Sequence, residues 1–174
     1  MTENSRRIDH DADTRTAELS SLWVTVGLVV LAAPNLAAGI WGLIAPQHWF
    51  DNFPGWAPRL VAAFAPFNDH LVSDAAAGLF ASGVAATVAL LWRRQQVVIT
   101  AMVALLAFAV PHAAFHLTHP ADALSSTENA LNTVTLWLAV AIAVAITLVA
   151  TRRDSQPRTH VPGDEHDAGE PRPT

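Results

Sequence analysis

The amino-acid sequence predicts an all-α fold, a four-helix transmembrane bundle. Hydrophobic residues make up 52% of the 174 residues and charged residues only 14%, against a usual charged share of roughly a quarter. The apolar residues fall into four blocks, each near the roughly 20 residues that cross a bilayer as a helix. The charges collect in the two tails and in the connections between the blocks. This distribution is typical of an integral membrane protein.

The first block resembles a secretory signal because arginines precede it. Its apolar run is longer than the roughly 7–15 residues of a signal core, and no small-x-small cleavage site follows, so we expect a retained span. Residues 1–18 form a predicted polar cytoplasmic tail, residues 19–152 the membrane domain, and residues 153–174, rich in proline and acids, a disordered cytoplasmic tail. The four predicted spans cover residues 22–44, 71–92, 97–118 and 130–150.

The arginines predict how the spans are oriented. All ten basic residues are arginine, and all but Arg59 lie in the two tails, in the connection between the second and third spans, or at the end of the membrane domain (Arg152). Cytoplasmic segments of membrane proteins carry an excess of basic residues. We therefore expect both termini in the cytoplasm, and loops 45–70 and 119–129 on the outer side of a multi-pass protein of the bacterial inner membrane.

The composition also excludes several classes of function. The absence of cysteine excludes disulfides, thiolate nucleophiles, iron–sulfur ligation and covalent haem attachment. No basic patch with interleaved aromatic residues is present, so we expect no nucleic-acid partner. The expected partner is the lipid bilayer. A second copy of the chain and another membrane protein remain open as further partners.

Three histidines end the third span in the stretch PHAAFHLTHP. His112, His116 and His119 follow the spacing i, i+4 and i+7, which places them on one stripe of a helix. The second span begins with FNDHLVSD, where His70 and Asp74 are also four residues apart. All of these residues belong to the outer ends of their spans.

The fourth span adds polar residues at the same depth, because it opens with Glu128 and Asn132 on a shared helix face. An ionisable side chain within a span is costly and usually faces the interior of the bundle. We therefore expect Asp74, His112 and His116 to meet one another in the bundle.

Such a cluster favours a metal or haem site that serves redox chemistry or metal handling. Imidazole suits zinc, copper(II) and iron, and two histidines four residues apart can chelate one ion. The candidate haem ligands are His70, His112 and His116, since b-type haem needs only two axial histidines from facing helices. The candidate metal ligands are His70, Asp74, His112, His116 and His119, and Asn68, Glu128 and Asn132 are candidates for orienting them.

Two other classes of function remain open. A titrating chain of Asp74 and the histidines favours a proton relay or a proton-coupled transporter of small solutes. A buried network of the same side chains is also typical of a structural or assembly protein, in which the cluster stabilises the bundle. Whether the protein is an enzyme is left undecided by the residues.

The outer loop 45–70 is long, aromatic and rich in proline, and we expect it to fold over the outer opening of the bundle. Its residues Trp49, Phe50, Phe53 and Trp56 are interpreted as anchors at the membrane interface.

Two stretches of the chain carry a resemblance. Asn68-Asp69-His70-Leu71-Val72-Ser73-Asp74, preceded by Phe53-Pro54-Gly55, and Pro111-His112 with His116 resemble a pattern of small, uncharacterised bacterial four-helix membrane proteins. The resemblance covers the four spans but not the tails, and it implies no particular activity. By size and helix number the chain is also similar to the broader DoxX-like group, some of whose members are associated with quinone-linked oxidation. That second likeness concerns the fold alone.

Overall fold

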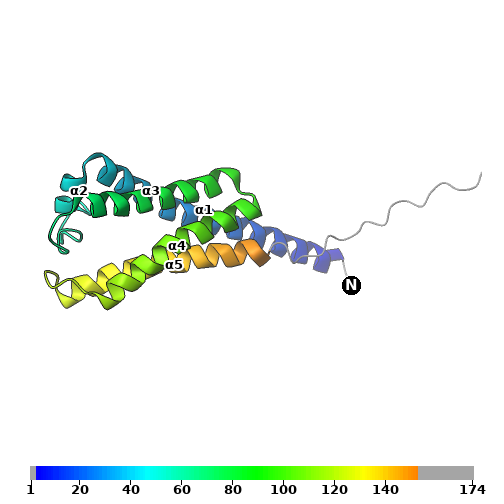
Figure 1. Ribbon diagram of the computed structural model, residues 1–174. Helices are drawn as coiled ribbons and strands as arrows, with labels where there is room; N and C mark the ends of the chain where they lie inside the picture. Colours follow the sequence, from blue (N-terminus) through cyan, green and yellow to red (C-terminus); the bar gives the residue numbers. More distant parts are fainter. Residues whose placement is uncertain (1–2, 153–174) are drawn as a thin grey trace, which may run out of the picture.

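The computed structural model describes residues 3–152, and within them the side chains from residue 22 onward. The predicted C-terminal tail, 153–174, lies outside the described residues. The described part is helical throughout, with turns and loops between its helices and no strand. Figure 1 shows the helices, which are α1 (Glu3–Ile44), α2 (Pro46–Asn52), α3 (Asp69–Trp92), α4 (Gln95–Thr118) and α5 (Ser126–Arg152).

All four predicted spans are confirmed. The helical segments long and apolar enough to cross a membrane differ from the predicted ranges by at most four residues at either end. They are Leu22–Ile44, Asp69–Trp92, Gln95–Thr118 and Ser126–Arg152. The chain is therefore a multi-pass membrane protein. Helix α1 extends beyond its span, because it begins at Glu3, inside the predicted N-terminal tail.

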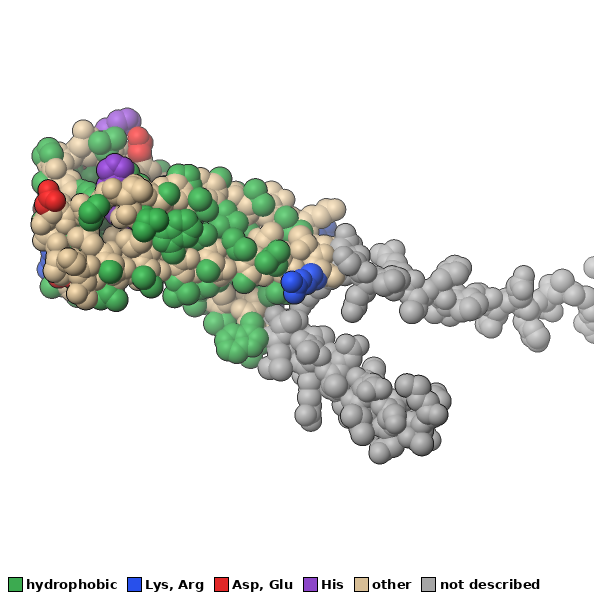
Figure 2. All heavy atoms as spheres, turned by 90° about the horizontal axis from the view of Figure 1, so that it is seen from below, with side chains coloured by type: hydrophobic (Ala, Val, Ile, Leu, Met, Phe, Trp, Pro, Cys, Tyr) green, Lys and Arg blue, Asp and Glu red, His purple; other side chains and the backbone are tan. Residues whose placement is uncertain are grey.

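The helices form two pairs, α1 with α3 and α4 with α5. Figure 1 shows that the pairs lie close together at the end where α3 connects to α4, and diverge toward the end that carries α2. We call the first the arginine end, because Arg93, Arg94 and Arg152 lie there. The second is the histidine end. Figure 2 shows histidine and acidic side chains gathered at that end, while hydrophobic side chains cover much of the remaining visible face.

The main hydrophobic core joins the two pairs toward the arginine end. Leu28 of α1 and Met102 of α4 are fully buried, and Ile146 of α5 is 4% exposed. A smaller cluster at the histidine end consists of Trp49, Phe50 and Val72. The two pairs are therefore packed together firmly at one end only.

Helices α1 and α3 touch backbone to backbone. A Cβ atom added to Gly83 of α3 would lie 2.6 Å from the backbone nitrogen of Leu36, and one added to Gly39 of α1 would meet the backbone of Phe80. Small residues permit this close approach in lipid, where helix association depends on van der Waals packing. Gly78 of α3 instead makes room for the Phe108 ring of α4.

The predicted outer loop contains a short helix. Pro46 occupies the first turn of α2, where its missing N–H is not needed. The helix turns Trp49 and Phe50 inward, so that they are only 4% and 7% exposed. The prediction that these two rings are interfacial anchors is therefore wrong. The ring of Trp56, by contrast, is 69% exposed.

The close contact between α1 and α3 gives a stability prediction. The change Gly83→Val should lower the free energy of unfolding by about 1–3 kcal/mol, because the new side chain overlaps the Leu36 backbone. Thermal unfolding in mild detergent measures the effect. The matched control is Ala81→Val on the exposed side of the same helix, which should leave the midpoint nearly unchanged. Equal midpoints for the two variants would contradict the backbone contact.

Candidate functional site

A cavity of about 410 Å³ lies at the histidine end, between α3 on one side and α4 and α5 on the other. We call it the histidine chamber. The loop that follows α2 contributes Leu60, Val61 and Phe64 to its wall. All but four of its lining residues are aliphatic or aromatic, and the polar ones are Asn68, His112, His116 and Asn132.

A second cavity, of about 300 Å³, adjoins the histidine chamber toward the middle of the bundle. The two cavities share four lining residues, which are Phe53, Leu79, His112 and Leu136. Polar groups are sparse around the second cavity, where Asn35, Ser82 and Thr135 join His112. The space between the diverging helix pairs is therefore extended and mostly apolar.

His112 and His116 lie side by side on α4. Their ring centroids are 4.8 Å apart and the rings are nearly perpendicular, at 74°. His112 stacks on Phe108 at 5.4 Å, and His116 makes an edge contact with Phe64 at 5.1 Å. Both histidines are half-buried, and Ala113, which lies between them in the sequence, is fully buried. This side of α4 therefore faces the interior. The predicted histidine stripe therefore faces the chamber at these two positions.

Helix α5 brings an amide to the same wall. The Nδ2 atom of Asn132 lies 3.4 Å from Nδ1 of His116, and the Thr133 hydroxyl donates to the backbone oxygen of His116 at 3.4 Å. Asn132, His112 and His116 thus form the polar wall of the histidine chamber.

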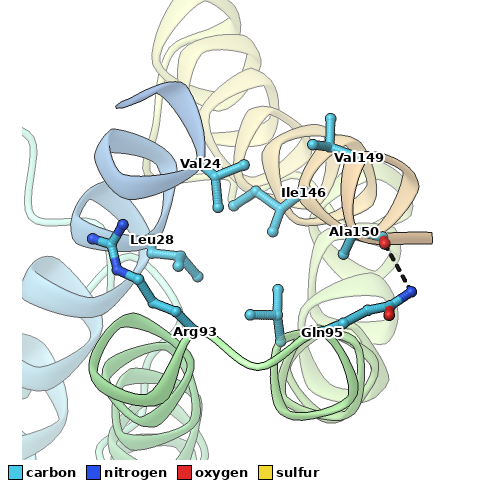
Figure 3. A pocket seen from close by; sticks show the side chains of 8 residues that line it. Val24, Leu28, Arg93, Gln95, Ile146, Val149 and Ala150 are labelled. Atoms are coloured by element: carbon cyan, nitrogen blue, oxygen red, sulfur yellow. Dashed lines mark hydrogen bonds between the residues drawn. The ribbon is translucent and has the colours of Figure 1, made fainter. Parts of the chain in front are cut away.

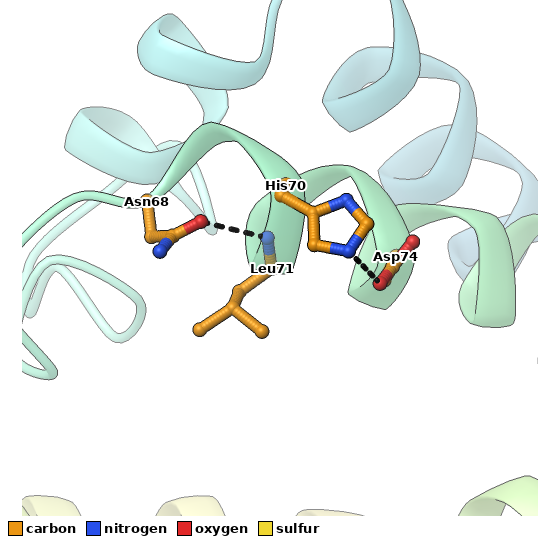
Figure 4. A network of polar contacts seen from close by, with 4 residues as sticks. All are labelled: Asn68, His70, Leu71 and Asp74. Atoms are coloured by element: carbon orange, nitrogen blue, oxygen red, sulfur yellow. Dashed lines mark hydrogen bonds and ion pairs between the residues drawn. The ribbon is translucent and has the colours of Figure 1, made fainter.

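His70 and Asp74 are paired with each other outside the chamber. Nε2 of His70 lies 3.4 Å from Oδ2 of Asp74, and the two side chains are 83% and 65% exposed. Figure 4 shows this pair on α3, with Leu71 directed to a different side of the helix. The expectation that Asp74 meets His112 and His116 is therefore wrong.

The physical reason lies in the register of α3. Leu71, Ala75 and Leu79, spaced four residues apart, line the histidine chamber. Each residue along an α-helix turns by about 100°, so His70 and Asp74 fall beside that stripe rather than on it. Shared depth in the membrane did not imply a shared direction.

His119 also turns away from the polar wall. It ends α4, and its ring stacks on Phe115 at a centroid distance of 4.4 Å with an interplanar angle of 7°. Its Nδ1 lies 2.9 Å from the Thr118 hydroxyl. These contacts occupy His119 locally at the helix end.

Glu128 and Asn68 cap helices. The Glu128 carboxylate accepts from the backbone N–H of Ser125 at 2.8 Å and from its hydroxyl at 2.7 Å. The backbone N–H of Glu128 donates back to Ser125 Oγ at 3.3 Å, which completes a capping box. Asn68 begins α3 by accepting from the backbone N–H of Leu71 at 3.1 Å. The Ser-x-x-Glu spacing of Ser125 and Glu128 is the sequence signal for the first cap.

Among the described residues, no group of three or more histidine, aspartate or glutamate side chains is placed to hold one metal ion. Of the predicted metal ligands, only His112 and His116 lie together in the wall of the histidine chamber. They cannot ligate opposite faces of one haem, because they project from the same side of one helix, four residues apart. No facing histidine is placed against them within residues 22–152.

Comparison of the chain with protein-family models, with curated proteins and with solved structures finds no match. The similarity to small bacterial four-helix membrane proteins and to the DoxX-like group therefore stays a prediction.

Asn129, which contacts the loop 119–125, is expected to stabilise the fold more than Asn132 does. Asn129 clamps this loop, because its amide donates to the backbone oxygen of the buried Ala121 at 3.0 Å and its oxygen accepts from the Ala121 N–H at 2.9 Å. Asn129→Ala should lower the free energy of unfolding by about 1–3 kcal/mol, because both backbone groups lose their partner.

Thermal unfolding in detergent measures this effect, and Asn132→Ala is the matched control. Asn132 faces the chamber with one contact at 3.4 Å, so its removal should change the midpoint less. A larger loss for Asn132→Ala than for Asn129→Ala would contradict the assignment of the two amides.

Proposed function

We propose that the protein binds a small, lipid-soluble ring compound with oxygen hydrogen-bond acceptors in the histidine chamber. The observation that carries this proposal is the chamber itself, about 410 Å³ of mostly apolar space with its imidazoles and an amide on one wall. Ligand pockets commonly measure roughly 300–1,000 Å³ and combine apolar walls with a few convergent polar groups.

The polar wall offers donors to such a ligand. A neutral imidazole has one donor nitrogen and one acceptor nitrogen. If Nδ1 of His116 accepts from the Asn132 amide, its proton resides on Nε2, which is then available to a carbonyl or hydroxyl oxygen. A hydrogen bond in these apolar surroundings is electrostatically stronger than the same bond in water.

The rings beside the histidines favour a flat partner. Phe64 and Phe115 lie 6.2 Å apart, and His116 makes edge contacts with both of them. Aromatic rings pair favourably at such distances in offset or edge arrangements. These contacts support a ring compound over a flexible chain.

We further propose that the protein resides in the bacterial inner membrane with the histidine chamber near the outer face. This orientation is supported by the arginines Arg93, Arg94 and Arg152 at the opposite end of the bundle.

Two probes of the same shape test the ligand proposal. Duroquinone and durene are tetramethylated rings that differ in two carbonyl groups. Both should raise the unfolding midpoint of the purified protein, since a ligand that binds the folded state stabilises it. Duroquinone should bind more tightly, and His116→Phe should weaken its binding by about threefold to tenfold while leaving durene nearly unchanged, because one hydrogen bond is lost.

The matched control is His70→Phe, since His70 lies outside the chamber. It should leave the binding of both probes unchanged. If neither probe shifts the midpoint of wild-type protein at saturating concentration, the chamber does not bind this class of ligand.

A second candidate function is metal binding by His112 and His116, completed by a ligand from solution. It is favoured by their spacing on one helix and by their 4.8 Å centroid distance, since two histidines at i and i+4 on a helix are a common zinc pair. If this pair binds a metal, titration with zinc or copper(II) should give about one bound ion per chain. The variants His112→Ala and His116→Ala should lose that ion, and His119→Ala should keep it. Equal metal content in all three variants would exclude the pair as the site.

A further inference from the structure

A separate cavity, of about 230 Å³, lies at the arginine end of the bundle. We call it the arginine cavity. Val24 and Leu28 of α1 and Ile146 of α5 form its apolar side, and Arg93 and Gln95 contribute polar atoms. Figure 3 shows these side chains around the opening, with the Arg93 guanidinium at the rim beside α1. The cavity does not share a lining residue with the histidine chamber.

Arg93 adopts a backbone conformation that normally favours glycine. Its φ is 40°, and it is the one non-glycine residue with positive φ in the described part of the chain. An arginine in this left-handed region is strained where glycine would not be. Arg93 is the C-cap that ends α3, and its backbone N–H donates to the Ala89 backbone oxygen at 3.1 Å. Its Nε donates to the Leu90 backbone oxygen at 3.1 Å, which holds the guanidinium beside the cavity.

The first turn of α4 meets the same cavity. Its N-cap residue, Arg94, makes no side-chain capping hydrogen bond. The Gln95 side chain does not cap the helix either, because its amide donates to the Ala150 backbone oxygen of α5 at 3.0 Å, as Figure 3 shows. The first N–H groups of a helix have no partner within it and attract anions. A guanidinium and an uncapped helix start therefore flank one cavity with apolar walls.

We propose that the arginine cavity binds an anionic phospholipid. The phosphate group lies against Arg93 and the start of α4, and the upper acyl chain follows Val24, Leu28 and Ile146. This occupant matches both the positive rim and the apolar walls. The cavity also lies directly after Trp92, at the end of a membrane span, where lipid headgroups are found.

The proposal is tested on the full-length chain in mild detergent, by counting retained lipid with native mass spectrometry after addition of phosphatidylglycerol or phosphatidylcholine. Wild-type protein should retain phosphatidylglycerol preferentially. Arg93→Gln should weaken that retention about tenfold or more, as expected for a lost charge-assisted hydrogen bond. Arg94→Gln removes the same charge from a side chain that does not line the cavity, and it should change retention by less than about twofold.

A second variant separates binding from folding. Arg93→Gly removes the guanidinium and relieves the strained φ, so it should unfold at a midpoint equal to or above that of wild type without lipid, and still lose phosphatidylglycerol. Val24→Phe fills the cavity and should lower retention of the lipid as well.

Four results would overturn the proposal. They are equal retention of phosphatidylglycerol and phosphatidylcholine, equal losses for Arg93→Gln and Arg94→Gln, unchanged retention by Val24→Phe, and displacement of the lipid by inorganic phosphate at the same concentration. The last result would identify soluble phosphate as the ligand.

Discussion

The backbone contact between α1 and α3 is the constraint on which the remaining structure depends. In a bilayer, apolar side chains gain little by leaving lipid, so helices associate where their surfaces fit closely. Gly39 and Gly83 give this pair such a fit, whereas α4 and α5 form a separate pair. The two pairs meet through Leu28, Met102 and Ile146 near the arginine end and diverge beyond them. The histidine chamber is the space that this divergence leaves, partly closed by α2 and its loop.

The lack of hydrogen-bond partners in lipid explains the surroundings of the polar residues. Polar groups at membrane depth need partners, because lipid supplies none. His112 and His116 face the chamber, where Asn132 and aromatic rings surround them. His70 and Asp74 face outward and contact each other at 3.4 Å near the end of the bundle. The two residue pairs have the same i, i+4 spacing but different surroundings. The pair His112 and His116 lines the histidine chamber, and the pair His70 and Asp74 does not.

The two ends of the bundle offer chemically different cavities. At the histidine end the lining contains imidazole and amide groups, which suit neutral ligands with hydrogen-bond acceptors. At the arginine end a guanidinium and an uncapped helix start suit an anion. The bilayer provides both kinds of ligand, dissolved molecules and charged headgroups. The two proposals together assign a ligand chamber to one half of the membrane and a lipid contact to the other.

The sequence by itself determined the four spans, because a long apolar run is a local property that the cost of burying backbone and charge in lipid decides. It also placed His112 and His116 on one helix stripe, since helical spacing is local too. Only the tertiary structure decided which stripe faces inward. It sent Asp74 and His70 outward and buried Trp49 and Phe50. Those outcomes depend on the rotation of each helix about its axis, which is set by packing against the neighbouring helices and has no signature in any single span.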